Sequence, residues 1–306
     1  MQSGPDEPES FDVIIVGGSY AGLSVAMSLG RALRRTLVID AGDPCNRQTP
    51  HSHNFLTQDG NTPAEIAALA REQVQRYDTV NFISATAVSA QKIQGRYSVR
   101  LADGQTLESR KLLLATGVRD MLPDIPGLAE CWGISVLHCP YCHGYEVRDT
   151  PIGLLANGAD GLHLARLLHN WSESLTLFTN GTSTLDAGDA ALLASHGITI
   201  DERKIARLEH HNGMLQSIIF NDGSRQEINS IFARVPTQQK SGLAVELGCD
   251  LNDNGLINVD EMQRTSVPGV FAAGDNCWAL RSVANAIGAG SKAGAFINHE
   301  MINEDF

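Results

Sequence analysis

The chain has 306 residues, with 35 acidic and 23 basic side chains and a formal net charge of −12 at pH 7. This length is sufficient for two compact domains with buried cores. The negative charge argues against nucleic acid or an anionic membrane as the main partner, because both would repel it. The charge suits a soluble enzyme, with or without a basic docking partner.

No stretch approaches the ~20 apolar residues that cross a bilayer. Residues 1–10 are polar and acidic, unlike a secretory signal, and predict a disordered lead-in. One close cysteine pair and four scattered cysteines do not form the pattern of a secreted disulfide scaffold. We therefore expect a cytoplasmic protein with one redox-active pair, and four buried, apolar thiols at Cys45, Cys131, Cys249 and Cys277.

The first predicted elements form a βαβ unit. Residues 11–16 are a β-branched run typical of a buried parallel strand, and residues 36–40 form the next strand. Between them, the Gly-Gly-Ser-Tyr-Ala-Gly turn of residues 17–22 leads into an Ala/Leu-rich helix that ends near Leu33. A helix over 63–77 follows, and strands at 97–101 and 106–114 flank an Asp-Gly turn.

A second βαβ pattern occupies residues 152–178, with strands at 152–156 and 175–178 and a helix over 162–171. Residues 269–275 then predict a strand with a Gly-Asp turn, and residues 282–301 a closing helix. We infer that this last segment completes the first domain. The predicted fold class is α/β, with two Rossmann-like (three-layer ββα) dinucleotide-binding domains. The second domain (119–242) is inserted in the first (11–118 and 243–306).

The turn at residues 17–22 has the features of a dinucleotide cradle. Free N–H groups at a helix N-terminus can hold a pyrophosphate, and an acidic residue ending the next strand can hold a ribose hydroxyl. Asp40 lies 23 residues after Gly17, as this pattern requires. Ser19 replaces the middle glycine of the fingerprint, although its hydroxyl could itself contact phosphate. A tight strand-to-helix turn without a ligand is the alternative.

The central phrase His-Cys-Pro-Tyr-Cys-His, residues 138–143, lies between the two nucleotide-binding patterns. In a Cys-x-x-Cys pair one thiolate can attack a disulfide and the other can resolve the mixed disulfide. The alternative is a zinc site, but four ligands within six consecutive residues cannot readily surround one tetrahedral ion. We therefore predict a redox pair and no metal site. The residues alone do not order the two thiols.

Together these features resemble the low-molecular-weight thioredoxin reductase family of FAD-dependent disulfide oxidoreductases, from Phe11 to Ile302. This resemblance implies a homodimer, an inserted domain that rotates on hinges near residues 117–120 and 241–246, and bound FAD. The residues that it implies for FAD contact are Gly17, Gly18, Ser19, Ala21, Gly22, Asp40, Arg47, His53, Asn54, Ala87, Ala115, Thr116, Gly117, Gly274, Asp275, Arg281, Ser282 and Val283.

The resemblance also implies roles around the pair, with Cys142 nearest the flavin and Cys139 attacking the substrate. His143 stands where most members have an acidic residue, so it is the expected acid/base, with His138 and Glu146 as further candidates. The phrase Cys-x-x-Cys-His-Gly-Tyr-Glu and the loop at 47–57 also resemble dithiol oxidases. In that loop His51 and His53 either approach the flavin ring or cap the loop.

The second nucleotide turn departs from the family pattern. Ala156 replaces the first glycine, and Asp160 adds negative charge where phosphates would lie. No Lys or Arg occurs between Arg166 and Arg203, where the family has a His-Arg-Arg cluster for the NADPH 2′-phosphate. We therefore expect a weak or lost NAD(P)H site. The electron donor would be a ferredoxin-type carrier, or a second FAD in the inserted domain.

The expected function is disulfide oxidoreduction, in which two electrons pass between FAD, the Cys139/Cys142 pair and an external disulfide. The substrate would be a thioredoxin-like protein or a small disulfide or dithiol. The alternatives are an NADPH-dependent thioredoxin reductase and a dithiol oxidase that uses O₂. A flavin-binding redox sensor without efficient turnover is the alternative from another class.

Overall fold

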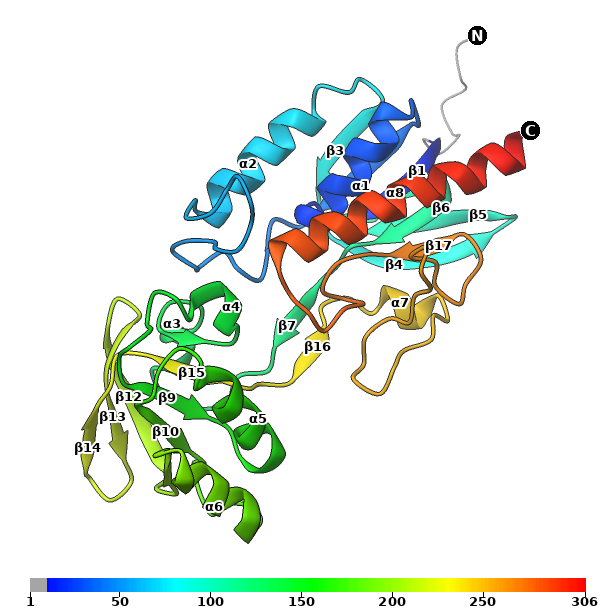
Figure 1. The fold of residues 1–306 in the computed structure, drawn as a ribbon. Helices are drawn as coiled ribbons and strands as arrows, with labels where there is room; N and C mark the ends of the chain where they lie inside the picture. Colours follow the sequence, from blue (N-terminus) through cyan, green and yellow to red (C-terminus); the bar gives the residue numbers. More distant parts are fainter. Residues whose placement is uncertain (1–9) are drawn as a thin grey trace. The chain divides into compact units, whose positions relative to one another are not determined.

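The computed structural model describes residues 10–306, which divide into two compact units (Figure 1). The first unit comprises residues up to 47, 63–119 and 237–306, and the second comprises 48–62 and 120–236. The second crossing between the units thus falls at residues 236/237 rather than at the expected 242/243. The reason lies within the first unit, where Lys240 N donates to the Gly117 carbonyl at 3.3 Å and Lys240 Nζ lies 2.5 Å from Asp43.

One sheet forms the centre of the first unit, in the order β3-β2-β1-β6-β5-β4. Its parallel strands are β1 (Ser10–Val16), β2 (Thr36–Asp40), β3 (Val80–Ser84) and β6 (Thr106–Leu114), and its antiparallel strands are β4 (Ala87–Ile93) and β5 (Arg96–Leu101). The first half of β6 pairs with β5, and its second half pairs in parallel with β17 (Val270–Ala272). The chain's last strand therefore joins the sheet formed by the chain's beginning.

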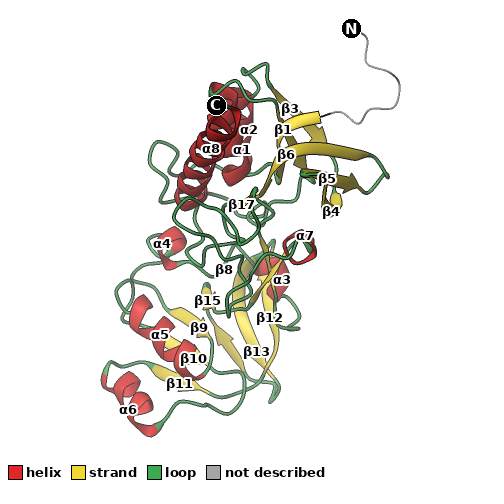
Figure 2. Ribbon diagram, turned by 90° about the vertical axis from the view of Figure 1, so that its right-hand side faces the viewer, coloured by secondary structure: helices red, strands yellow, loops and turns green. Residues whose placement is uncertain are grey.

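The parallel strands of this sheet are buried on both faces, as their continuous apolar runs predict. On one face, residues such as Ile14, Leu37 and Leu112 pack with Tyr97 and Val99 of the β4–β5 meander. The opposite face is covered by α1 (Tyr20–Arg31) and α8 (Val283–Asp305), which lie side by side, with α2 (Pro63–Val74) next to α1 (Figures 1 and 2). Helices, sheet and meander are the three expected layers.

The contact between α1 and α8 is made through small residues. A Cβ atom at Gly290 would lie 2.3 Å from the Ala21 carbonyl oxygen, and one at Gly294 would lie 2.5 Å from the Ser28 Cβ. Ser24 Oγ also donates to the Ile287 carbonyl at 2.8 Å. Without side chains at these glycines, the two helix backbones approach each other closely.

The second unit contains a parallel sheet in the order β11-β10-β9-β15-β8 and an antiparallel sheet β12-β13-β14. These strands are β8 (Val136–Leu137), β9 (Ile152–Leu155), β10 (Leu175–Phe178), β11 (Thr199–Asp201), β12 (Ile205–His211), β13 (Met214–Phe220), β14 (Arg225–Glu227) and β15 (Ile231–Ala233). Its helices are α3 (Leu128–Cys131), α4 (Pro140–His143), α5 (Gly158–Leu168) and α6 (Ala187–Ser195). The crossings between units carry β7 (Val118–Asp120) and β16 (Thr237–Gln239), and α7 (Leu243–Glu246) follows.

Several predicted boundaries differ from the structure. The first helix ends at Arg31, before Leu33, which has a positive φ of 59°. The helix α5 begins four residues before the predicted start at residue 162 and ends three residues before the predicted end at residue 171. The closing helix extends beyond Met301 to Asp305. Ion pairs hold this last turn, since Asp305 lies 2.9 Å from Arg34 and 2.7 Å from Arg110. Only Phe306 remains outside the helix.

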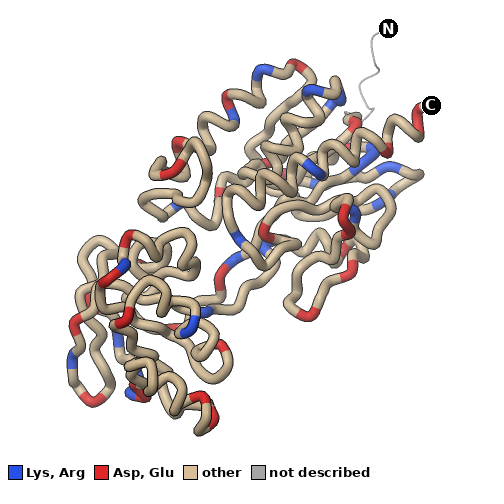
Figure 3. Tube along the Cα trace, viewed as in Figure 1, with Lys and Arg blue, Asp and Glu red and all other residues tan. Residues whose placement is uncertain are grey.

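Charged residues of both signs are distributed over both units (Figure 3). Among residues 10–306, no helix is long and apolar enough to span a bilayer.

The small-residue contact predicts opposite effects for two glycines of α8. Gly294→Val should destabilise the protein by about 1–3 kcal/mol, because the added side chain would collide with α1. Gly288→Ala should stabilise it by roughly 0.5–1 kcal/mol, because a Cβ there meets no described atom within 4 Å and alanine favours helix. Thermal melting of both variants measures the difference. Equal shifts in melting temperature would contradict this account of the helix contact.

Candidate functional site

Three turns meet at the carboxyl edge of β1, β6 and β17 in the first unit. Gly17 has a φ of +111°, and a Cβ atom there would lie 2.1 Å from the Ala115 carbonyl oxygen. A Cβ at Gly22 would lie 1.9 Å from the Gly17 carbonyl oxygen. Ala115 N in turn donates to the Val16 carbonyl at 2.8 Å. The first glycine turn and the Ala115–Gly117 turn are therefore in direct backbone contact, which only glycine permits.

Asp40 lies beside the same turn. A Cβ at Gly18 would lie 2.6 Å from the Asp40 carboxyl carbon. One Asp40 oxygen accepts from Gly42 N at 3.1 Å, and the other lies 3.5 Å from Arg71. The Asp40 carbonyl accepts from Ala85 N at 3.1 Å, which brings the start of β4 at Ala87 near this end of the sheet. The predicted ribose-binding carboxylate is thus placed next to the glycine turn.

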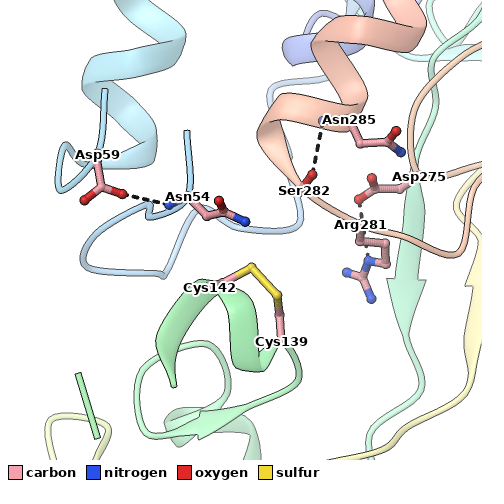
Figure 4. The surroundings of a disulfide bond; sticks show 8 residues. All are labelled: Asn54, Asp59, Cys139, Cys142, Asp275, Arg281, Ser282 and Asn285. Carbon is pink, nitrogen blue, oxygen red and sulfur yellow. Dashed lines mark hydrogen bonds and ion pairs between the residues drawn. A yellow bond between two sulfur atoms is a disulfide. The ribbon is translucent and has the colours of Figure 1, made fainter. Parts of the chain in front are cut away.

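The third turn brings in the C-terminal residues (Figure 4). Gly274 has a φ of +96°, and a Cβ there would lie 3.0 Å from the Ala21 Cβ on α1. Asp275 Oδ2 lies 3.5 Å from Arg281 Nε. Ser282 Oγ accepts from Asn285 N at 3.1 Å and so caps α8, which begins at Val283.

The residues of these three turns fit a bound dinucleotide. The helix α1 begins at their junction and carries no acidic residue in its first turn, and within the described part of the chain Ser19 makes no side-chain capping bond. Its N-terminal N–H groups can therefore receive a pyrophosphate close to the backbone. Arg47 is the least integrated of the predicted residues in this unit, since it is largely exposed and pairs with Asp43 at 2.7 Å.

One of the four scattered cysteines differs from its prediction. Cys45 is only partly buried, and its sulfur lies 3.8 Å from Asp275 Oδ2 and 3.7 Å from an Arg281 nitrogen. No spacing rule indicates this position, because only the fold brings residues 45, 275 and 281 together. The other three are buried, and burial with the neighbouring Asp275 charge raises the pKa of Cys277 to about 12.

In the second unit, Cys139 and Cys142 form a disulfide across the short helix α4, with their Cα atoms 5.3 Å apart (Figure 4). Pro140 is the first residue of this helix, where its fixed φ is favourable and its missing N–H is not needed. Cys142 N and His143 N both donate to the Cys139 carbonyl, at 3.1 and 3.2 Å. The turn thus fixes the two sulfur-bearing residues and His143 relative to one another.

His143 lies in an environment that favours its neutral form. Burial lowers the pKa of His143, the positive charge of His53 lowers it further, and Glu146 opposes both. The His53 and His143 rings lie edge to face with centroids 6.2 Å apart. His53 itself is placed between two carboxylates, with Nε2 3.6 Å from Glu146 and Nδ1 3.6 Å from Asp59. A neutral imidazole next to Cys142 can accept a thiol proton.

The predicted residues of the 48–62 loop are thereby grouped with the cysteine pair rather than with the glycine turns. His53 makes the contacts just described, and Asn54 N donates to Asp59 at 2.7 Å (Figure 4). His51 Nδ1 bonds the Gly60 carbonyl at 2.9 Å and ties the two ends of the loop together. His138 stacks on Trp132, with ring centroids 6.0 Å apart. Of the two carboxylates beside His53, Glu146 is a predicted site residue and Asp59 is not.

The second nucleotide turn has a neighbour that the sequence did not reveal. Asp160 pairs with Arg234, which follows β15, at 3.2 Å, so its charge is partly balanced. Lys204 also approaches the loop after β10, since its Cε lies 3.8 Å from where a Gly181 Cβ would be. In the same loop, however, Ser183 N donates to the Glu202 carboxylate at 2.6 Å. One acidic and one basic side chain thus approach the loop after β10.

Comparison with known proteins finds similarity across both units. Residues 11–290 match the family model described as pyridine nucleotide-disulphide oxidoreductase. The chain is 38% identical to thioredoxin reductase tcpT of Claviceps purpurea, over 95% of this chain and 94% of that protein. Its fold matches the putative thioredoxin reductase TrxB of Bacillus anthracis with a TM-score of 0.93, at 31% identity, over 97% of this chain and 100% of that one. An oxidoreductase from Agrobacterium tumefaciens matches with a TM-score of 0.90, at 39% identity, over 96% and 99% of the two chains.

The surroundings of His143 predict opposite pKa changes in two variants. Glu146→Gln should lower the pKa of His143 further, because it removes the charge that raises it, and His53→Asn should raise it. The acid limb of a pH profile that requires neutral His143 should move to lower pH in the first variant and to higher pH in the second. NMR titration of the His143 ring, assigned with His143→Asn, measures both shifts.

His211→Asn is the matched control, because His211 is an exposed histidine of β12 in the same unit. It should leave the His143 titration unchanged. Shifts of the same sign in Glu146→Gln and His53→Asn would show that these neighbours do not set the pKa of His143.

Proposed function

We propose that the Cys139–Cys142 pair exchanges two electrons with FAD and with an external disulfide. The chain belongs to the pyridine nucleotide-disulphide oxidoreductase family and is a flavoprotein disulfide oxidoreductase. The observation that carries this proposal is the disulfide across α4, next to a histidine whose pKa is lowered. In the reducing direction the dithiol form breaks an external disulfide and becomes a disulfide again. Two thiols are released, and the two protons of the dithiol pass to the leaving thiolates.

We propose that FAD is held by the three turns of the first unit. The Gly17–Gly22 turn with the N-terminus of α1 would hold the pyrophosphate, Asp40 a ribose hydroxyl, and Asp275 the ribityl chain. The capped N-terminus of α8, at Ser282 and Val283, would face the flavin pyrimidine edge. When bound, FAD supplies the group that accepts and returns two electrons.

His143 is the proposed proton carrier for the pair. Its neutral ring adjoins Cys142 in the chain and can take a proton from one thiol, then return it to a leaving thiolate. Glu146, which lies 3.6 Å from His53, opposes the lowering of the His143 pKa that burial and His53 cause. This arrangement would carry protons without a carboxylate directly after the second cysteine.

We propose that the electron donor is not a pyridine nucleotide. The 36 positions from Leu167 to Glu202 contain no Lys or Arg, and the Glu202 carboxylate lies on the loop after β10. A 2′-phosphate would meet repulsion there instead of a guanidinium clamp. A reduced ferredoxin-type carrier or a second flavin would then supply electrons. The substrate is proposed to be a thioredoxin-like protein or a small disulfide or dithiol. The enzyme is proposed to be a homodimer, as the resemblance implies, and cytoplasmic, as the cysteine pattern indicates.

A second candidate function is dithiol oxidation with O₂ as the final acceptor. A neutral His143 supports this direction too, because an oxidase must remove protons from an incoming dithiol before its thiolate can attack the Cys139–Cys142 disulfide. The substrate dithiol would become a disulfide as the Cys139–Cys142 disulfide becomes a dithiol. Bound FAD would supply the chemistry that reoxidises the pair, and O₂ would take up the two electrons and two protons as hydrogen peroxide. Peroxide release with dithiol and O₂, faster than reduction of external disulfides, would favour this direction.

Replacing Cys142 with Ser should leave FAD bound and reduce disulfide turnover by at least about a thousandfold, because the resolving partner of Cys139 is lost. Turnover is measured with the flavin photoreduced and an aromatic disulfide as acceptor. Cys249→Ser is the matched control, since that buried thiol lies in the core of the first unit next to Thr265. Full turnover by Cys142→Ser would refute the proposed electron path.

Anaerobic mixing of the oxidised holoenzyme with NADPH, and separately with NADH, should leave the visible flavin absorbance unchanged over many seconds. The reason is that residues 167–202 contain no Lys or Arg and that the Glu202 carboxylate lies beside the loop after β10. Reduced ferredoxin should bleach the same absorbance rapidly. Fast bleaching by NADPH would instead identify a pyridine-nucleotide-dependent thioredoxin reductase.

A further inference from the structure

Asn157 is the most highly connected side chain at the second nucleotide turn. Its Oδ1 accepts from Gly158 N at 2.8 Å, from Thr184 N at 2.9 Å and from Thr184 Oγ1 at 3.2 Å. Its Nδ2 donates to the Thr182 carbonyl at 2.9 Å. The orientation of the amide follows from these partners, because all the donors lie on one side and the carbonyl on the other. One side chain therefore joins the start of α5 to the loop after β10.

These donors are of the kind that a dinucleotide phosphate uses. In a Rossmann unit the first N–H groups of the helix after the glycine turn receive the pyrophosphate. Here the N–H of Gly158, the first residue of α5, is bonded by Asn157. The turn and the loop are also in contact, since a Cβ at Gly158 would lie 2.6 Å from Thr184 Oγ1. The Asn157 carboxamide oxygen thus takes up an N–H donor of the kind that a phosphate oxygen would use.

The loop is also fixed from its other side. Asn180 Oδ1 accepts from Ile205 N at 2.8 Å, and Thr179 Oγ1 donates to the Gly181 carbonyl at 2.6 Å. The Glu202 carboxylate accepts from Ser183 N at 2.6 Å. The loop is therefore anchored to β11 and β12 independently of Asn157. If the Asn157 hydrogen bonds were lost, the loop would separate from the start of α5 but would stay folded.

We propose that Asn157 is an internal ligand that closes the second nucleotide turn and thereby determines that pyridine nucleotides do not serve as donor. This inference rests on the donor part of the proposed function and gives it a residue-level cause. Asn157 would exclude NADH and similar dinucleotides that carry no 2′-phosphate, whereas Glu202 acts against NADPH. Glu202 would repel a 2′-phosphate but can accept a bond from a ribose 2′-hydroxyl, as acidic residues do in NAD sites.

The test uses the FAD-loaded protein and its Asn157→Gly variant. Glycine removes the carboxamide and is itself well tolerated at helix N-caps, so the variant should fold. Anaerobic calorimetric titration with NADH, NADPH and ADP-ribose measures binding, and stopped-flow mixing measures flavin reduction. We expect NADH and ADP-ribose to bind Asn157→Gly at least about tenfold more tightly than the wild type, with a smaller gain for NADPH.

Two further variants sharpen the test. Asn180→Gly is the matched control, because it changes an asparagine of the same loop, at a φ of +52° that glycine accepts, and leaves the Asn157 contacts in place. It should bind NADH like the wild type. Asn157→Ser keeps a good helix cap but is too short to reach both Thr182 and Thr184, so it should behave like Asn157→Gly.

The outcomes separate this inference from the proposed function. If both Asn157 variants fold and bind NADH no better than the wild type, Asn157 is not the closing ligand, while the donor proposal stands. If the wild type binds NADH tightly and its flavin is reduced, the closure and the non-pyridine donor both fail. The electron path through Cys139 and Cys142 is untouched by either result, because it is tested without a nucleotide.

Discussion

At Gly17 the backbone of the first turn lies against the carbonyl of Ala115 at a distance that leaves no room for a side chain. This approach requires β1 and β6 to be adjacent and parallel, so that their carboxyl ends meet at one edge. β17 adds its own end beside β6, which brings Gly274 and Asp275 to the same place. Residues from the first, middle and last parts of the chain become one site because three parallel strands end together.

The sequence predicted correctly those elements whose local residue pattern agrees with their place in the fold. The βαβ runs, the glycine turn and the position of Asp40 follow from strand burial and turn chemistry that act within about 30 residues. The fold class and the family were therefore accessible. The antiparallel sheet β12-β13-β14 and the short helices were not predicted, because their residues alternate irregularly between buried and exposed positions.

The site was less predictable, for a physical reason. Cys45, Asp275 and Arg281 lie within 4 Å of one another, yet more than 200 positions separate the first from the others. Likewise, Asp59 and Glu146 both face His53, which no spacing rule could reveal. A pattern of residues reports which chemistry is available, whereas a lowered pKa such as that of His143 depends on burial and on charges that only the folded chain assembles.

The ion-paired end of α8 has a consequence for biosynthesis. Arg34 and Arg110 bind Asp305, and β17 pairs with β6, so the first unit lacks a strand and a covering helix until the residues of α8 have left the ribosome. At about 5–20 residues per second, the second unit emerges in full several seconds before that moment. Both of its segments, 48–62 and 120–236, precede β17 and α8, so it can fold first. The first unit would then be the later of the two to complete its core.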